Sequence, residues 1–302
     1  MAQEVLEGLI TDEDGIYVDA TVGGGGHAAA ILSGLSATGR WIGLDRDPAA
    51  IRMATETLLP DGNRVILKEG VFWRLRETLD ALNVRWIDGI LFDLGVSSRQ
   101  IDDPARGFSY LRDGPLDMRM GEEGRSALEV VNRVSYEDLH RLFRDYGEER
   151  RAAAIARAIC RARERSPILR TGELTEIIRS AIPQDQSQKT LARIFQAIRI
   201  EVNEELDHLR DALGQAVDHL RSGGRIGVIS YHSLEDRTVK TAFSEWAQGC
   251  ICPPDFPVCR CGKQKRIRFT GKWGRRGIRP TSQEIASNPR ARSATLRISE
   301  KI

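Results

Sequence analysis

The sequence predicts an α/β fold, in which a parallel sheet is covered by helices on both faces and interrupted by a helical insertion. Short apolar runs, each as long as a buried strand, alternate with segments that suit helices near the start of the chain. About 128 residues then separate the fourth apolar run from the fifth, although a whole strand–helix–strand unit needs only ~30 residues. The 302 residues suffice for one large domain or two ordinary ones.

The composition excludes the simplest membrane and secreted classes. Hydrophobic residues make up 41% and charged residues 29% of the chain, and the mean hydropathy is -0.35. No run approaches the roughly 18 apolar residues of a membrane helix, and the first residues show no basic segment followed by an apolar stretch. Five cysteines are too few for a disulfide scaffold. We therefore expect a cytoplasmic protein with no membrane partner.

The strands and helices of the core follow from apolar runs and the segments between them. The expected strands are residues 15–21, 40–45, 64–67, 88–94 and 225–230. The expected helices are 27–35, 48–59 and 204–220, the second of which begins with a proline, where the first turn tolerates one.

The long gap before the fifth strand is rich in Arg, Glu, Ala and Leu at helical spacing. Apolar residues three and four positions apart predict amphipathic helices over 136–144 and 148–165. We therefore predict an inserted helical domain over residues 104–197, with residues 1–103 and 198–302 forming the core.

A glycine-rich loop follows the first expected strand and opens a helix. Gly23, Gly25 and Ala28 satisfy the looser form of the dinucleotide fingerprint, and Asp45 ends the next strand, where a carboxylate can accept hydrogen bonds from ribose. These features indicate an adenosine-type cofactor, either NAD or S-adenosylmethionine; the alternative is a turn that binds nothing. Asp19, an acid just before the glycines, favours S-adenosylmethionine, because NAD folds usually keep apolar residues there.

Two further positions lie where ligands of open α/β sheets bind. Asp93 ends the fourth strand and can reach both a cationic cofactor and a substrate amine; the alternative is a helix-cap or turn carboxylate. Phe72, just after the third strand, can flank an adenine ring, but a lone phenylalanine more often packs in the core.

The C-terminal part of the chain is strongly basic. Residues 260–302 hold 13 Lys or Arg and two acids, so this segment attracts phosphate backbones unless it is merely a solvated terminus. Phe269 and Trp273 lie among these cations, which suits RNA binding, with a packed segment as the alternative. We expect His232 to lie in a helix cap or in a loop that shapes the substrate site, because Ser233 and Asp236 have the spacing of a helix cap.

Four cysteines form two closely spaced pairs, which are Cys250 with Cys252 and Cys259 with Cys261. Four thiolates can bind a structural zinc ion, but one-residue spacing within a pair is less usual than spacings of two to four. Spacing alone therefore favours reduced or transiently oxidised thiols over zinc.

Nine motifs occur in order along nearly the whole chain. They are Asp19-Ala-Thr-Val-Gly-Gly-Gly-Gly-His27, Gly43-Leu-Asp-Arg-Asp-Pro48, Asp93-Leu-Gly-Val-Ser-Ser98, Arg106-Gly-Phe-Ser109, Asp113-Gly-Pro-Leu-Asp-Met-Arg-Met120, Tyr146-Gly-Glu-Glu-Arg150, Phe195-Gln-Ala-Ile-Arg-Ile200, Tyr231-His-Ser-Leu-Glu-Asp-Arg237 and Asn288-Pro-Arg-Ala-Arg-Ser293. This series closely resembles the MraW/RsmH family of small-subunit ribosomal RNA (cytidine N4) methyltransferases.

The resemblance implies a Rossmann-like class I methyltransferase core with an inserted helical domain that recognises substrate. It implies small-subunit (16S) ribosomal RNA as the partner, within the assembled subunit or as naked RNA, and S-adenosylmethionine as the cofactor. The cofactor-binding residues it implies are Gly25, Gly26 and His27 in the first loop, Asp45 at the ribose, Phe72 beside the adenine, and Asp93 and Gln100 completing the pocket. Relatives usually begin with a His-x-Pro-Val-Leu-Leu-like segment that this chain starts after; if that segment lines the site, activity is weakened.

The implied reaction needs help from the protein, since the exocyclic amine of cytidine is a poor nucleophile. Asp93 is the expected catalytic acceptor of the amine hydrogens. Two other functions stay open at this point. One is an RNA-binding ribosome-assembly factor that keeps a cofactor pocket without turnover, and the other is an NAD-dependent oxidoreductase.

Overall fold

The computed structural model describes residues 1–121, 123–253 and 258–302 and divides the chain into two compact units. Unit 1 comprises Met1–Gly95 with Leu206–Ile302, and unit 2 comprises Val96–Glu205. The expected insertion, 104–197, lies inside the range of unit 2. No helix in the described ranges is both long and apolar enough to cross a membrane.

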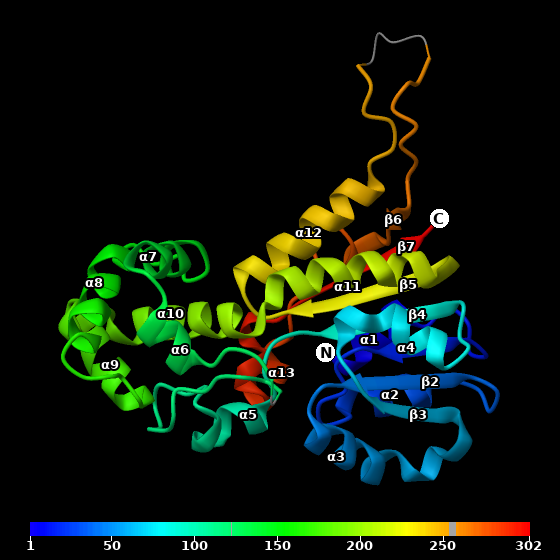
Figure 1. The fold of residues 1–302 in the computed structure, drawn as a ribbon. Coiled ribbons are helices and arrows are strands. Elements are labelled where there is room, and N and C mark those ends of the chain that lie inside the picture. The colour runs from blue at the N-terminus through cyan, green and yellow to red at the C-terminus, as the bar shows by residue number, and fades with distance from the viewer. Residues whose placement is uncertain (122, 254–257) are drawn as a thin grey trace. The chain divides into compact units, whose positions relative to one another are not determined.

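Unit 1 is built on a seven-stranded sheet of order β3-β2-β1-β4-β5-β7-β6 (Figure 1). Its strands are β1 (Ile16–Asp19), β2 (Arg40–Asp45), β3 (Val65–Glu69), β4 (Ile87–Asp93), β5 (Leu220–Ser230), β6 (Ile267–Phe269) and β7 (Thr295–Lys301). The first five pair in parallel, as the sequence predicts. Two further strands, which were not predicted from the sequence, extend the sheet at one edge, where β7 pairs antiparallel with β5 and with β6.

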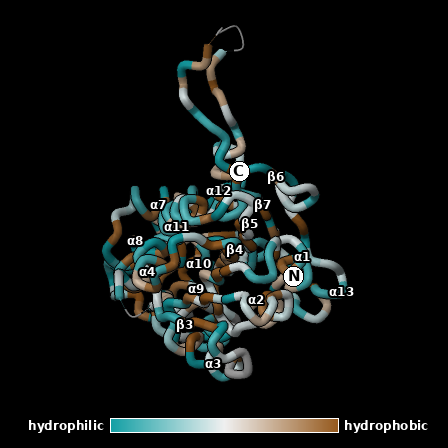
Figure 2. Tube along the Cα trace, turned by 90° about the vertical axis from the view of Figure 1, so that its right-hand side faces the viewer, coloured by the Kyte–Doolittle hydropathy of each residue, from teal (hydrophilic) through white to brown (hydrophobic). Residues whose placement is uncertain are grey.

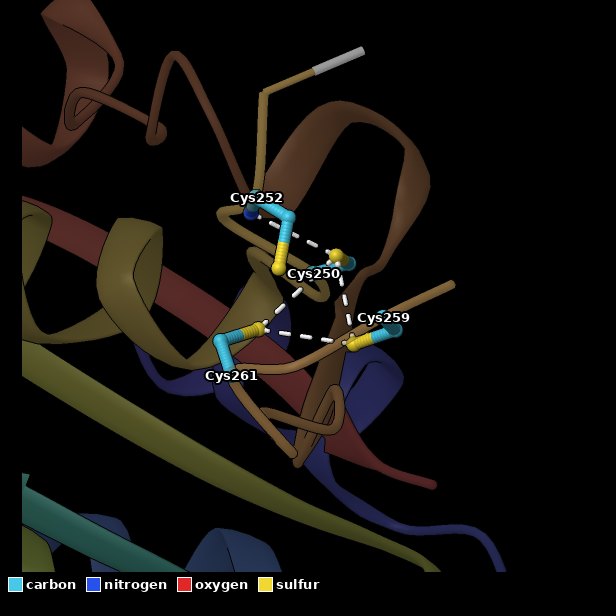
Figure 3. A group of neighbouring side chains, drawn as sticks. All are labelled: Cys250, Cys252, Cys259 and Cys261. Atoms are coloured by element: carbon cyan, nitrogen blue, oxygen red, sulfur yellow. Dashed lines mark hydrogen bonds between the residues drawn. The ribbon is translucent and has the colours of Figure 1, made fainter. Parts of the chain in front are cut away.

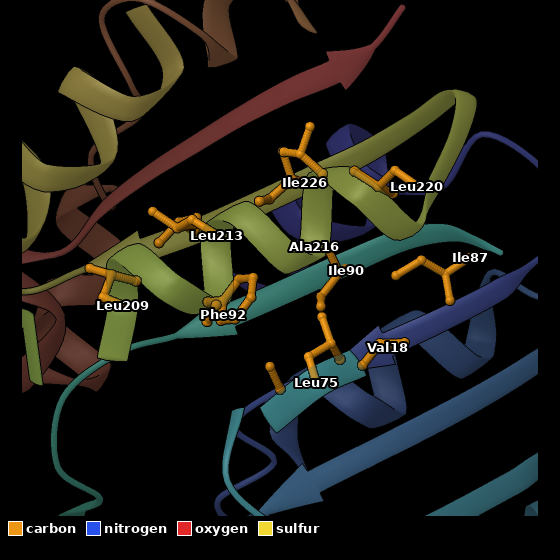
Figure 4. Close-up of a cluster of buried hydrophobic side chains, with 14 of the residues drawn as sticks. Val18, Leu75, Ile87, Ile90, Phe92, Leu209, Leu213, Ala216, Leu220 and Ile226 are labelled. Atoms are coloured by element: carbon orange, nitrogen blue, oxygen red, sulfur yellow. The ribbon is translucent and has the colours of Figure 1, made fainter. Parts of the chain in front are cut away.

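Helices cover both faces of this sheet, as expected. The helices of unit 1 are α1 (Ala2–Leu9), α2 (Gly26–Ser33), α3 (Pro48–Leu58), α4 (Leu75–Ala81), α11 (Glu205–His219), α12 (Ser233–Ala247) and α13 (Ser282–Ser287). One core lies against α4, α11 and α12, where Leu209 and Leu213 face Phe92 (Figure 4). The other core holds side chains of α1, α2 and α3. Ile90 and Leu91 lie in different cores, because successive residues of a strand point to opposite faces.

Unit 2 is helical and has a core of its own. Its helices are α5 (Ser98–Asp102), α6 (Ala127–Arg133), α7 (Tyr136–Asp145), α8 (Ala152–Arg163), α9 (Thr171–Ser180) and α10 (Ser187–Asn203). The expected helix 136–144 is α7, which begins where the Ser135 hydroxyl accepts the Asp138 backbone N–H. The expected helix 148–165 is shorter, because Glu148 has a φ of +46° and interrupts the helical backbone. Phe143, Ile155 and buried side chains of α6, α9 and α10 form the core.

Two chain segments leave unit 1 between α12 and β6. The described arms, residues 248–253 and 258–266, extend away from the sheet (Figures 1 and 2). At their base the Arg266 backbone N–H donates to the Trp246 carbonyl at 2.8 Å, and the Arg266 guanidinium lies over the Trp246 ring at 5.4 Å. The arms are thus joined where they meet the sheet.

Candidate active site at the carboxyl edge of the sheet

The parallel strands bring three acids to one edge of unit 1. Asp19, Asp45 and Asp93 end β1, β2 and β4. The chain runs outward from β1 through β2 to β3 and then crosses to β4 on the other side of β1. The carboxyl ends of β1 and β4 therefore flank the point where the strand order reverses, which is where open α/β sheets bind ligands.

The glycine loop joins the carboxyl end of β1 to α2 and therefore lies at this edge. Gly23 and Gly25 have φ values of +52° and +79°, a backbone conformation that favours glycine, and Gly25 is the N-cap of α2. The Gly23 backbone N–H donates to Asp45 Oδ2 at 2.8 Å, while Asp45 Oδ1 accepts from the Asp47 N–H at 2.8 Å. Burial raises the pKa of Asp45 above its usual value. The carboxylate of β2 therefore fixes the loop.

Asp93 is held from three elements. Its Oδ1 accepts a hydrogen bond from the Tyr231 hydroxyl at 2.9 Å, and its Oδ2 lies 3.4 Å from His27 Nε2. Its backbone N–H donates to Thr21 Oγ1 at 2.7 Å. Tyr231 follows β5, Thr21 lies in the loop after β1, and His27 lies in the first turn of α2. Two of these partners, Thr21 and Tyr231, were not expected from the sequence, although both stand inside recognised motifs.

The ionisable groups around Asp93 influence one another's pKa values. Burial of Asp19, of which 1% is exposed, raises the pKa of its carboxyl to about 7, although the charge of His27 opposes the rise. Burial acts to lower the pKa of His27, but the hydrogen bond and charge of Asp93 outweigh it and raise that pKa. Burial, followed by the Asp93 charge, raises the pKa of Tyr231, so the phenol stays protonated and remains a donor.

Phe72 lies near the same edge, in the 3₁₀ turn Phe72–Arg74 that follows β3. Its ring meets the Phe92 ring edge-on at 6.0 Å and the Trp73 ring edge-on at 5.3 Å. The ring is partly buried against the core, so packing occupies at least part of it. Trp73 in turn stacks on His208 at 3.6 Å, with the Arg46 guanidinium 5.4 Å from its ring.

Gln100 belongs to unit 2 and takes part in a helix cap. Its Oε1 accepts the Ser97 N–H at 2.9 Å, and its own N–H donates to the Ser97 hydroxyl at 3.2 Å, forming a capping box at the start of α5. The contact of Gln100 with a cofactor stays a prediction.

His232 is a cap residue, as expected. Its Nδ1 accepts the Glu235 N–H at 3.3 Å, and the Glu235 carboxylate accepts the Tyr231 N–H at 2.7 Å. Asp236 does not take part in that cap. It forms a bidentate pair with Arg297 of β7 at 2.7 and 3.0 Å.

The C-terminal aromatics expected to stack on RNA are partly packed. Phe269 of β6 lies against the core and carries the Arg275 guanidinium 5.4 Å from its ring. Trp273 lies against the core formed with α1, and the Lys272 ammonium lies 4.4 Å from its ring. For these two rings, packing against the core and RNA binding therefore both agree with the structure.

The four paired cysteines lie on the two arms beyond α12 (Figures 1 and 3). All are free thiols, and their sulfur atoms lie within 4.8 Å of one another. The fifth, Cys160, lies in α8.

The profile of the MraW methylase family matches residues 1–302, which is the full length of the chain. The chain belongs to the MraW methylase family. Among curated members, the Ribosomal RNA small subunit methyltransferase H of Heliobacterium modesticaldum is 48% identical over all of this chain and 97% of its own length. The protein of that name from Geotalea uraniireducens is 49% identical with the same coverage. A solved rRNA methylase from Streptococcus thermophilus aligns with 100% of this chain and 93% of its own, at 14% identity and a TM-score of 0.41.

The carboxyl edge of the sheet, with its glycine loop, fits S-adenosylmethionine. At Gly24 and Gly26 no atom lies within 4 Å of where a Cβ would stand, so the concave side of the loop is open. His27 Nδ1 is buried and has no hydrogen-bond partner among the described residues. The Asp93 carboxylate provides negative charge for a ligand that carries a sulfonium and an ammonium group, and Asp19 adds to it above its pKa of about 7.

Proposed function

We propose that this chain transfers a methyl group from S-adenosylmethionine to the exocyclic N4 amine of a cytidine in small-subunit ribosomal RNA. The observation that carries the proposal is the Asp93 carboxylate, positioned at the strand-order reversal by Tyr231 and His27. Full-length relatives named Ribosomal RNA small subunit methyltransferase H support the choice of substrate.

Gly25, Gly26 and His27 hold the cofactor in the first loop, with Asp45 at its ribose and Phe72 beside its adenine. When bound, S-adenosylmethionine supplies an electrophilic methyl group on a positively charged sulfur. The open positions at Gly24 and Gly26 leave the backbone of the loop free to approach a ligand closely. We also assign Gln100 to cofactor binding.

Asp93 acts on the substrate amine. The nitrogen lone pair of this amine is delocalised into the ring, so the amine attacks only as its nitrogen becomes tetrahedral. A carboxylate that accepts one of its hydrogens favours that change and takes the proton that the nitrogen loses. The Tyr231 hydroxyl and His27 fix the direction of this carboxylate, which orients the amine.

The target cytidine has to leave its stack for this chemistry, so the rest of the chain holds RNA. We assign that role to the helical unit around residues 104–197 and to the basic segment 260–302. This segment holds 13 Lys or Arg residues and only two acids. The substrate is the assembled small subunit, in the cytoplasm.

The test uses S-adenosylmethionine labelled on its methyl group and small ribosomal subunits that lack cytidine N4 methylation. After incubation, the RNA is digested to nucleosides and the position of the label is determined, with protein-free RNA as a second substrate. We expect label on cytidine N4 and more of it with subunits than with naked RNA. Absence of label, with cofactor binding intact by calorimetry, would replace the proposal with the assembly-factor function.

A further inference from the structure

The arms that extend from unit 1 bring four thiols together without a hydrophobic core around them. Cys250 and Cys252 lie on one arm, and Cys259 and Cys261 lie on the other (Figure 3). Three of the four are exposed, as are the nearby Ile251 and Val258. Apolar burial therefore contributes little to holding the two arms against each other at this point.

The sulfur atoms have the spacing of a tetrahedral metal–thiolate centre. Cys250 Sγ lies 3.4 Å from Cys259 Sγ and 3.7 Å from Cys261 Sγ, and the last two are 3.6 Å apart. All four sulfurs lie within 4.8 Å of one another. A zinc ion with zinc–sulfur distances of about 2.3 Å would place its four sulfurs about 3.8 Å apart. The cluster therefore needs only small shifts to close on one ion.

Backbone N–H groups point at these sulfurs, as expected around thiolates. Cys261 Sγ accepts from the Ile251 N–H at 3.4 Å, and Cys252 Sγ accepts from the Arg260 N–H at 3.3 Å. Each of these bonds crosses from one arm to the other, so it fixes the pairs relative to each other. A third bond runs from the Cys252 N–H to Cys250 Sγ at 3.4 Å. Such donors stabilise sulfur that carries negative charge.

We propose that Cys250, Cys252, Cys259 and Cys261 bind one structural zinc ion that joins the two arms. On binding, the four thiols release four protons and form four zinc–sulfur bonds, which gives a centre of net charge −2 with no change of oxidation state. Arg260, between the two cysteines of the second arm, and Lys263 and Lys265 after them offset that charge. Four protein ligands leave no open position, so the ion holds the arms and takes no part in methyl transfer.

The decisive measurement is the metal content of the full-length protein, purified without added metal or chelator, by mass spectrometry of all first-row transition metals. We expect about one equivalent of zinc per chain. Cys259→Ser should lose most of this zinc, while Cys160→Ser, which changes a thiol of α8, should keep it. Cobalt exchanged into the protein should show the sulfur-to-cobalt charge-transfer bands of a tetrahedral thiolate site.

Three results would overturn the proposal. The first is metal-free protein in which all five cysteines react with a thiol reagent. The second is a protein whose mass under non-reducing conditions is lower by four hydrogens, since two disulfides would then join the arms. The third is iron in place of zinc. None of these measurements depends on methyl transfer, so their outcome is independent of the proposed activity.

Discussion

At the scale of single residues, Asp19 illustrates how this site lowers the stability of the fold. Its carboxyl is buried at the end of β1, accepts the Thr21 backbone N–H at 3.1 Å, and interacts with the charges of Asp45 and Asp93. Burial raises its pKa from 3.8 to about 7. A carboxyl whose pKa is higher in the folded chain than in the unfolded chain lowers the free energy of unfolding as the pH rises from the lower pKa to the higher one.

Asp19→Asn should therefore stabilise the protein at neutral pH. Below about pH 4 the folded and unfolded states both hold the proton, so the substitution changes little. Between about pH 4 and pH 7 the unfolded chain gives up this proton while the folded chain keeps it. The wild type therefore loses up to about 4 kcal/mol over this range, which follows from ~1.36 kcal/mol per pKa unit, and Asn avoids this loss. The Asn oxygen keeps the bond from Thr21. Thermal unfolding at pH 4 and pH 8 measures the difference, and S-adenosylmethionine affinity should fall at least about tenfold.

Asp211→Asn provides the control, because Asp211 is exposed on α11. Its stability should stay within about 0.5 kcal/mol of the wild type at both pH values. A destabilised Asp19→Asn variant at pH 8 would mean that the buried carboxyl contributes more as an anion than its burial costs.

The position of Asp93 was predictable from the sequence, but its hydrogen-bond partners were not. Strand ends predict where Asp45 and Asp93 lie, because a short apolar run followed by an acid is a local pattern. Tyr231 is 138 positions from Asp93 along the chain and Thr21 is 72 positions away. Their contacts depend on which strands become neighbours, so no local pattern predicts them.

At the scale of elements, glycines at the junction of the β1–α2 loop and α2 serve two purposes. One allows a left-handed backbone, and the other leaves space for a ligand. Gly25 has a φ of +79°, whereas Gly26 opens α2 without a positive φ. A Cβ at Gly25 would lie 4.0 Å from Ala54 Cα, and a Cβ at Gly26 would meet nothing within 4 Å. The first position is restricted by the backbone, and the second is restricted only by what binds there.

Gly25→Ala should therefore destabilise the fold by about 1–2 kcal/mol, the cost of the left-handed conformation for alanine. Gly26→Ala should leave stability unchanged or slightly raised and still weaken S-adenosylmethionine binding by at least about tenfold, since the methyl fills the open side of the loop. Denaturant unfolding and calorimetry measure the two effects.

Gly214→Ala is the matched control, because Gly214 lies inside α11 with no atom near its Cβ position. It should stabilise the protein by about 0.5–1 kcal/mol and leave cofactor affinity unchanged. Normal affinity in Gly26→Ala would show that the cofactor does not approach this part of the loop.

The five parallel strands were predictable from their apolar runs, whereas β6 and β7 were not. β1, β2 and β4 follow from apolar runs separated by helices. β7 pairs antiparallel with β5 about 70 residues earlier in the chain, and its Leu296 and Ile298 alternate with polar residues over only one short segment. Such a segment has too little pattern of its own to reveal its place in the sheet.

At the scale of the whole molecule, the two units have separate cores. The buried side chains of unit 2, among them Phe143, Ile155 and Ile194, form one cluster that contains no residue of unit 1. A unit of this size with its own core can fold independently.

Residues 96–205 expressed alone should therefore unfold cooperatively and show a strong helical circular dichroism signal. Phe143 is fully buried, so Phe143→Ala in this fragment should lower stability by about 3–5 kcal/mol. Arg141→Ala, at an exposed position of α7, should change it by less than about 0.5 kcal/mol. A gradual transition that Phe143→Ala does not move would contradict an independent core.

The central claim is that Asp93 accepts the hydrogens of the substrate amine in a site that binds S-adenosylmethionine. The most direct test compares the wild type with Asp93→Asn, measuring cofactor affinity by calorimetry and single-turnover methylation of small subunits with labelled S-adenosylmethionine. Asn keeps the size of the side chain but loses the charge and one acceptor. We predict a loss of about 100-fold or more in the rate of label transfer to cytidine N4, with cofactor affinity within about tenfold of the wild type. An unchanged rate of transfer would contradict the account.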